Sequence, residues 1–221
     1  MLTSRYRSSS RQTIQIPYRN ANLTSSVSGK SGHKVRLAVD HPLCMEIYRL
    51  CGELDWPVLL HLQYRDYSYN FDALEQVLQE CPETTFIGHA TAWWANISAD
   101  VPQDYRARDY TGYPKDAVVV GGLTDRWLEE YPNVYGDLSA GSGLGALTRD
   151  PEFARDFVRR HRTRLLWATD CPCRDGKGDW GEDGRRECFA ARSLPVLRDL
   201  CESEDHFADI THRNAERLLG L

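Results

Sequence analysis

The sequence predicts an α/β fold in which helices cover a parallel sheet, and three short apolar runs carry this prediction. Residues 57–61, 85–89 and 164–170 each begin as an apolar run and end in a polar residue, namely His61, His89 and Asp170. Apolar runs of this length, bounded by turn signals, are typical of strands buried on both faces. Stretches with the apolar spacing of helices separate the runs, and this alternation favours a parallel sheet.

The folded domain is predicted to span residues 34–221, after a disordered tail at 1–33 that is rich in Ser, Arg, Asn and Thr. Strands are expected in chain order at 35–39, 57–61, 85–89, 134–138 and 164–168. Helices are expected near 43–54, 71–80, 123–131 and 151–161, and around Pro195. The aromatic insertion at 90–121 is expected to pack at a pocket rim. The glycine-rich segment 139–145 reads as a loop.

Charge and composition exclude several classes of function. The net charge is −5, but residues 1–39 hold seven basic residues and no acidic one, so the remainder carries −12. An acidic body argues against nucleic-acid binding, which needs basic faces. No apolar run approaches the roughly 18 residues of a membrane helix. Seven cysteines without a secretory signal suggest reduced thiols and a cytoplasmic protein; targeting by an Arg- and Ser-rich transit peptide is the alternative.

The polar residues at the strand ends suggest a metal site. The carboxyl ends of parallel strands meet at one edge, where α/β proteins build their chemistry. His61, His89 and Asp170 are therefore expected to lie together, and imidazole and carboxylate groups are ordinary zinc ligands.

Five motifs stand in a recognisable order along the chain. They are Pro57-Val-Leu-Leu-His61, Ile87-Gly-His89, Asn133-Val-Tyr-Gly-Asp-Leu-Ser139, Leu165-Leu-Trp-Ala-Thr-Asp-Cys-Pro172 and Asn214-Ala-Glu-Arg-Leu-Leu-Gly-Leu221. From about residue 34 onward the chain resembles the metal-dependent amidohydrolase superfamily. Within that superfamily it looks like the branch that contains aminocarboxymuconate-semialdehyde decarboxylase.

This resemblance implies a (β/α)8 TIM barrel with a divalent metal, usually zinc, at its C-terminal mouth. His61 and Asp170 would be metal ligands, while His89 would act first as acid or base and second as a ligand. His89 and Asp170 are the implied catalytic pair. The implied reaction is the hydrolysis or decarboxylation of a small carboxylate, lactone or amide by a metal-activated water.

One feature of the family is missing. The His-x-His pair of its first strand does not occur in this sequence, and five expected strands fall short of the eight in a closed barrel. The expected fold is therefore an incomplete barrel with about the last five strand–helix units. The alternative function is a truncated, noncatalytic paralogue or fragment that needs a partner chain. Open sheet edges tend to pair with other chains, so a homo-oligomer is also expected.

Four further residues are candidates for substrate binding. Trp93 and Trp94 would line the pocket, with aromatic packing against the barrel as the alternative. Ser139 and Gly141 belong to the loop after a strand, where backbone N–H groups could bind a substrate anion. A dinucleotide site is the rival interpretation of this loop, but its third glycine is misplaced for that motif.

Overall fold

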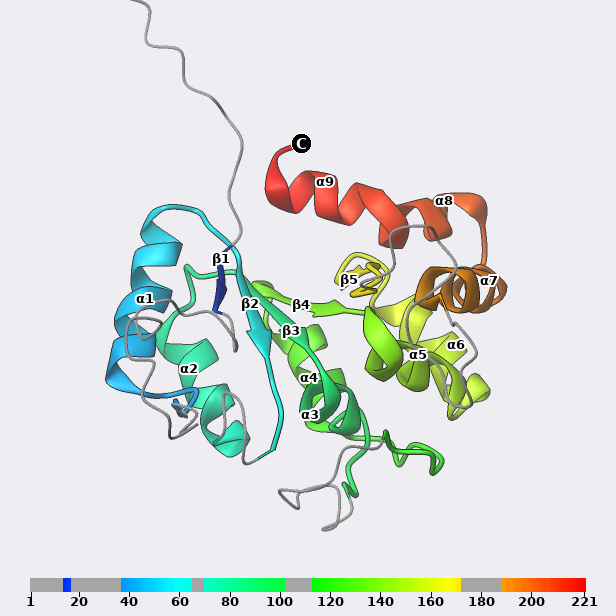
Figure 1. Ribbon diagram of the computed structural model, residues 1–221, viewed down its shortest axis with the longest axis horizontal. Coiled ribbons are helices and arrows are strands. Elements are labelled where there is room, and N and C mark those ends of the chain that lie inside the picture. Colours follow the sequence, from blue (N-terminus) through cyan, green and yellow to red (C-terminus); the bar gives the residue numbers. More distant parts are fainter. Residues whose placement is uncertain (1–13, 17–36, 65–69, 102–112, 172–187) are drawn as a thin grey trace, which may run out of the picture.

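The computed structural model describes residues 14–16, 37–64, 70–101, 113–171 and 188–221. They contain one five-stranded parallel sheet in the order β1-β2-β3-β4-β5. Its strands are β1 (Ile14–Ile16), β2 (Val58–His61), β3 (Phe86–His89), β4 (Val134–Asp137) and β5 (Leu165–Leu166). Neighbours in the sheet are therefore neighbours in the chain, and Figure 1 shows the strands crossing the middle of the molecule.

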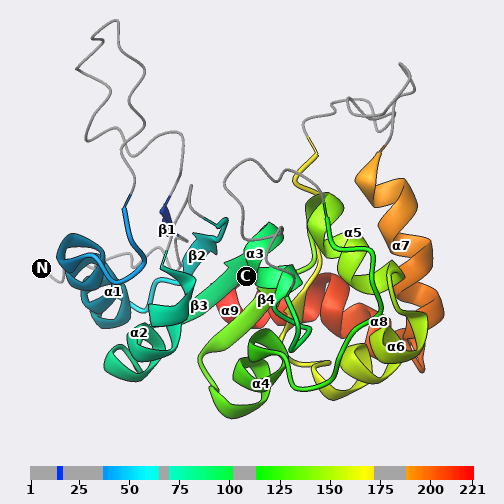
Figure 2. The same cartoon turned by 90° about the horizontal axis from the view of Figure 1, so that it is seen from below.

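The helices follow the strands in alternation. Their bounds are α1 (Pro42–Glu53), η1 (Phe71–Ala73), α2 (Leu74–Glu80), α3 (Thr91–Ala95), α4 (Leu123–Glu130), α5 (Ala140–Thr148), α6 (Pro151–Arg160), α7 (Phe189–Leu200), α8 (Glu204–Ala208), the π-helical turn η3 (Asp209–Arg213) and α9 (Asn214–Leu219). Figure 2 places α1 and α2 at the β1 side and α5, α6 and α7 at the opposite side. None of the helices in the described ranges is long and apolar enough to cross a membrane.

The strand order distinguishes this sheet from a doubly wound one. Crossover connections between parallel strands are right-handed, so a chain that always moves to the next strand keeps its crossovers on one face, as in a (β/α) barrel. The predicted α/β class is confirmed. The described sheet holds five strands, whereas a closed barrel has eight.

The core lies where helices pack on this sheet. All four residues of β3 are buried, which confirms that the apolar run at 85–89 is covered on both faces. The largest fully buried side chains come from strands and helices alike: Trp93, Trp127, Tyr48, Phe86 and Phe157. Helix starts also follow local chemistry, because Pro151 opens α6 and the Asp150 side chain accepts a hydrogen bond from the Phe153 amide at 3.1 Å.

The first strand is not where the sequence placed it. Over its described residues the expected strand at 35–39 shows only a single bridge, at Ala38. The strand beside β2 is instead β1, at residues 14–16 of the predicted tail, whose β-branched Ile14 and Ile16 favour extended backbone. The rest of the tail lies outside the described residues, so its disorder stays a prediction.

The segment after β4 is also different from expectation. Residues 139–145 were expected to form a loop, but α5 runs from Ala140 to Thr148. Glycine disfavours a helix, yet a Cβ on Gly143 would lie 2.2 Å from the backbone of Leu138. The close approach of α5 to the end of β4 requires glycine, so the tertiary contact overrides helix propensity.

Candidate active site

The two strand-end histidines meet at the C-terminal edge of the sheet. His61 and His89 occupy paired positions in the register of β2 and β3. Their ring centroids are 5.1 Å apart, and the rings meet edge to face. The prediction that these two strands bring their histidines together is confirmed.

His89 is the buried centre of a hydrogen-bond network at this edge. Its side chain is 6% exposed, and its Nδ1 lies 3.0 Å from Oδ2 of Asp137, the last residue of β4. Nδ1 also lies 3.1 Å from Oγ of Ser139, which donates to Asp137 Oδ2 at 2.6 Å. The Ser139 amide donates to the other carboxylate oxygen at 3.0 Å. One ring nitrogen of His89 is thus fixed by protein groups.

The other ring nitrogen faces the predicted acid at the end of β5. His89 Nε2 lies 3.8 Å from Asp170 Oδ2. This distance is too long for a hydrogen bond, and Asp170 is 61% exposed while His89 is buried. The protein covers only part of the Asp170 side chain, but the resulting loss of solvation outweighs the attraction of His89, and the Asp137 charge adds repulsion. The pKa of Asp170 is therefore raised from its ordinary value. The edge therefore holds a fixed imidazole beside a carboxyl group that takes up a proton more readily than usual.

The backbone at these strand ends is strained. Ala90, Ala140 and Asp170 have φ values of 79°, 58° and 45° without being glycine. Ala90 directly follows β3, while Ala140 and Asp170 lie in the segments that follow β4 and β5. The Ala140 amide donates to the Thr169 carbonyl at 3.1 Å. Such conformations cost roughly 1–3 kcal/mol each and concentrate at functional sites. The strain is independent support for a site at this edge.

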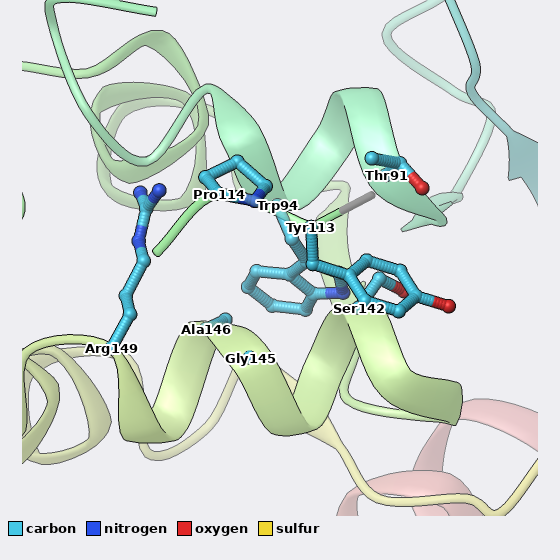
Figure 3. Close-up of a pocket in the computed structure, with 8 residues that line it drawn as sticks. All are labelled: Thr91, Trp94, Tyr113, Pro114, Ser142, Gly145, Ala146 and Arg149. Carbon is cyan, nitrogen blue, oxygen red and sulfur yellow. The ribbon is translucent and has the colours of Figure 1, made fainter. Parts of the chain in front are cut away.

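A hollow adjoins the site between α3 and α5 (Figure 3). It is lined by Thr91, Trp94, Tyr113, Pro114, Ser142, Gly145, Ala146 and Arg149. Thr91 is two residues beyond His89 in the chain, and the charge of Asp170 reinforces the effect of burial in raising the pKa of the Tyr113 phenol. The hollow and the acid–base groups are therefore close neighbours.

The substrate-binding candidates lie in different surroundings. Trp94 lines the hollow, and its Nε1 donates to the Asp137 carbonyl at 2.9 Å. Trp93 is 1% exposed and packs over Gly88, whose missing Cβ would lie 2.2 Å from the indole. Ser139 contacts His89, and Gly141 packs against the Tyr113 ring. The role of all four in binding a substrate stays a prediction.

The implied zinc site does not fit the described residues. His61, His89 and Asp170 gather at one edge, but no group of three His, Cys, Asp or Glu side chains in the described ranges could hold a metal ion. Catalytic zinc sites usually have three protein ligands. The ligand roles of these residues stay a prediction, and the groups that the structure describes here can transfer protons.

Sequence reasoning missed Asp137. The motif 133–139 contains Asp137, and this residue ends a strand as His61 and His89 do. The strand-end argument applied to Asp170 would have found it. Its contact with His89 spans 48 positions in sequence, so the pairing itself could only come from the structure.

A comparison with known protein families gives a match to the C-terminal part of the chain. The amidohydrolase family matches residues 124–221, a segment that contains Asp137, Ser139 and Asp170. Over these residues the chain is similar to the amidohydrolase family. His61 and His89 precede the matched amidohydrolase segment. A search among the sequences of curated proteins finds no match.

Solved structures similar to this chain include several decarboxylases. They include 2,6-dihydroxybenzoate decarboxylase from Rhizobium (15% identity, TM-score 0.46, covering 87% of this chain and 59% of that one). Another is dihydroxybenzoic acid decarboxylase from Polaromonas with bound manganese, at 15% identity and a TM-score of 0.46. The match covers 87% of this chain and 57% of that one. A third is 5-carboxyvanillate decarboxylase from Sphingomonas paucimobilis, at 15% identity and a TM-score of 0.47. The match covers 86% of this chain and 56% of that one. The chain thus spans less than three fifths of the length of each.

Proposed function

We propose that this protein is an amidohydrolase-type enzyme that acts on a small molecule by proton transfer, with His89 and Asp170 as its catalytic residues. The carrying observation is that His89 Nε2, at the end of β3, and Asp170 Oδ2, in the segment that follows β5, face each other across 3.8 Å. An atom of a substrate or a water molecule between them would contact both a base and an acid.

The substrate class follows from the family and the hollow. Amidohydrolase-type chemistry is hydrolysis or decarboxylation, and the notable neighbours of the site are the Trp94 and Tyr113 rings together with the cationic Arg149. We propose a small carboxylate, lactone or amide as the substrate. The decarboxylases named above supply two compounds to try first, 2,6-dihydroxybenzoate and 5-carboxyvanillate.

The test is a turnover assay on the purified full chain with these two acids, a simple lactone and an aryl amide. Release of carbon dioxide or of the hydrolysis product is measured with and without added Mn²⁺ or Zn²⁺. His89→Gln and Asp170→Asn are expected to lower kcat by about 10²-fold or more. His212→Gln is the matched control, because His212 is an exposed histidine outside the site.

Two results would contradict the proposal. A folded protein without turnover on this panel, with or without metal, favours the noncatalytic alternative. Equal activity of wild type and His89→Gln would remove His89 from the mechanism. Elemental analysis completes the experiment, because stoichiometric metal would mean that a donor outside the described residues completes the ligand set.

A further inference from the structure

We propose that Asp137 and Ser139 are positioning residues that hold His89 with its hydrogen on Nδ1 and so make Nε2 the reactive nitrogen. This inference rests on the proposed function, in which His89 moves the proton. It adds the two residues that decide which nitrogen does so.

The hydrogen bonds assign the proton on His89. Ser139 has a single hydroxyl hydrogen, and the carboxylate of Asp137, 2.6 Å away, can only accept it. Ser139 Oγ is then an acceptor toward Nδ1 at 3.1 Å, and the Asp137 carboxylate oxygen Oδ2 lies 3.0 Å from the same nitrogen as an ion-pair contact. Because a bare lone pair on Nδ1 would face an accepting hydroxyl oxygen and a carboxylate oxygen, Nδ1 carries the hydrogen, and the lone pair of the neutral ring is on Nε2.

The carboxylate that imposes this state is itself held in place. Its Oδ1 accepts from the Ser139 amide at 3.0 Å, and the backbone carbonyl of Asp137 accepts from Trp94 Nε1 at 2.9 Å. Asp137 is 8% exposed and Ser139 is 2% exposed. Ser139 is therefore no nucleophile: its hydroxyl hydrogen points to Asp137, and a substrate cannot reach its oxygen.

The consequence for catalysis is a defined proton path. A proton leaves the O–H of a substrate or water and binds the Nε2 lone pair, which gives an imidazolium with N–H on both nitrogens. The buried Asp137 carboxylate compensates the new positive charge through Nδ1. The same proton then passes from Nε2 to the leaving group, which restores the starting ring without any further donor.

The state of His89 can be measured without a substrate. Two-bond ¹H–¹⁵N NMR spectra of protein labelled at histidine report which ring nitrogen carries hydrogen, and the signal lost in His89→Gln identifies His89. We expect Nδ1–H as the major form of the neutral ring in the wild type. In Asp137→Asn the Ser139 amide retains the amide oxygen of Asn, so the Asn NH₂ faces Nδ1 and the major form changes to Nε2–H.

Ser139→Ala tests the second positioning residue. It removes the hydroxyl that contacts both Nδ1 and the Asp137 carboxylate but leaves the carboxylate and the Ser139 amide in place. Nδ1–H should therefore remain the major form, but with a smaller excess over Nε2–H than in the wild type. On any substrate that turns over, Asp137→Asn should lower kcat by about 10²-fold or more with little change in KM.

The inference is overturned if His89 of the wild type is mainly Nε2–H, and this spectrum decides even if the variants fail to fold. It is also overturned if folded Asp137→Asn keeps Nδ1–H. Absence of turnover would refute the proposed function while leaving the NMR result intact, so the two failures can be told apart.

Discussion

Asp170 combines a functional position with an environment that disfavours its charge. Its φ of 45° is unusual for a non-glycine residue, and burial raises its pKa while His89 opposes that shift only in part. Residues of this kind are typical of sites where stability is given up for chemistry. The charge of Asp170 should therefore destabilise the folded protein.

We predict that Asp170→Asn raises the melting temperature at neutral pH. Below the ordinary aspartate pKa of 3.8 both folded and unfolded chains are protonated at Asp170, so the variant and the wild type should not differ. As the pH rises above 3.8, the unfolded chain ionises first and the wild type loses relative stability. The difference should reach its full size above the raised pKa of the folded state. Thermal unfolding at several pH values measures it.

Asp156→Asn is the control with the opposite sign. Hydrogen bonds from Arg160 and Arg159 lower the pKa of Asp156, so its charge stabilises the folded state at neutral pH. Its replacement should lower the melting temperature slightly, because the carboxylate is about half exposed. A lower melting temperature for Asp170→Asn at neutral pH would show that attractive contacts dominate at Asp170.

At the residue scale the sequence predicted where the strand-end residues lie in the sheet better than it predicted which side chains contact one another. His61 and His89 could be placed together because both end apolar runs of a parallel sheet. The contact of Asp137 with Nδ1 of His89 could not be predicted, because it depends on which way each side chain turns at the end of its strand. A rotation of the Asp137 side chain would leave the sequence pattern unchanged and remove the network.

At the scale of elements, α5 shows how packing overrides local propensity. Its sequence, Ala-Gly-Ser-Gly-Leu-Gly-Ala-Leu-Thr, contains three glycines and was expected to begin as a loop. The glycines have different surroundings. Gly143 touches the Leu138 backbone, whereas the nearest atom to a Cβ on Gly145 would be Tyr113 Cβ at 3.8 Å.

We predict opposite effects of alanine at these two positions. Gly143→Ala would place a Cβ 2.2 Å from Leu138 C and O, so the free energy of unfolding should fall by about 1–3 kcal/mol. Gly145→Ala adds a methyl group in ordinary contact and should raise the free energy by about 0.5–1 kcal/mol, because alanine favours the helix interior. Urea unfolding measures both changes. Equal effects would mean that α5 is not packed against the end of β4.

At the scale of the whole molecule, a buried ion cluster joins α4 to α6. Both terminal guanidinium nitrogens of Arg160 donate to the Asp125 carboxylate, at 2.8 and 2.9 Å, and His161 Nε2 lies 2.6 Å from it. Burial alone would raise the pKa of Asp125, but hydrogen bonds from His161 and Arg160 lower it overall. This cluster ties the helix that precedes β4 to the helix that precedes β5.

We predict that Asp125→Asn lowers the free energy of unfolding by about 3 kcal/mol at neutral pH, because it leaves a partly buried guanidinium without its carboxylate. The contribution of Asp125 is present above its unfolded pKa of 3.8 and is lost as the pH falls through the lowered folded value. Asp156→Asn, which removes an exposed partner of the same Arg160, should cost at most about 1 kcal/mol. Equal losses in urea unfolding would contradict the special role of Asp125.

The described sheet has two edge strands, β1 and β5, and edge strands matter for the association of this chain with other chains. Unpaired edges tend to bind other strands, and α1, at the β1 side in Figure 1, exposes Leu43 and Leu50 by 42% and 50%. The homo-oligomer expected from the sequence stays a prediction.

The sequence is enough to predict the parallel α/β architecture, four of the five strands and the edge at which His61, His89 and Asp170 lie, because apolar periodicity and strand-end residues are local signals. Three features could be found only in the folded structure: residues 14–16 pair with β2, α5 is a helix, and Asp137 and Ser139 contact His89. The first and the third depend on contacts between segments about 44–50 positions apart, and the second depends on the close approach of Gly143 to the end of β4. Such contacts follow from tertiary packing, which the local pattern of residues does not specify.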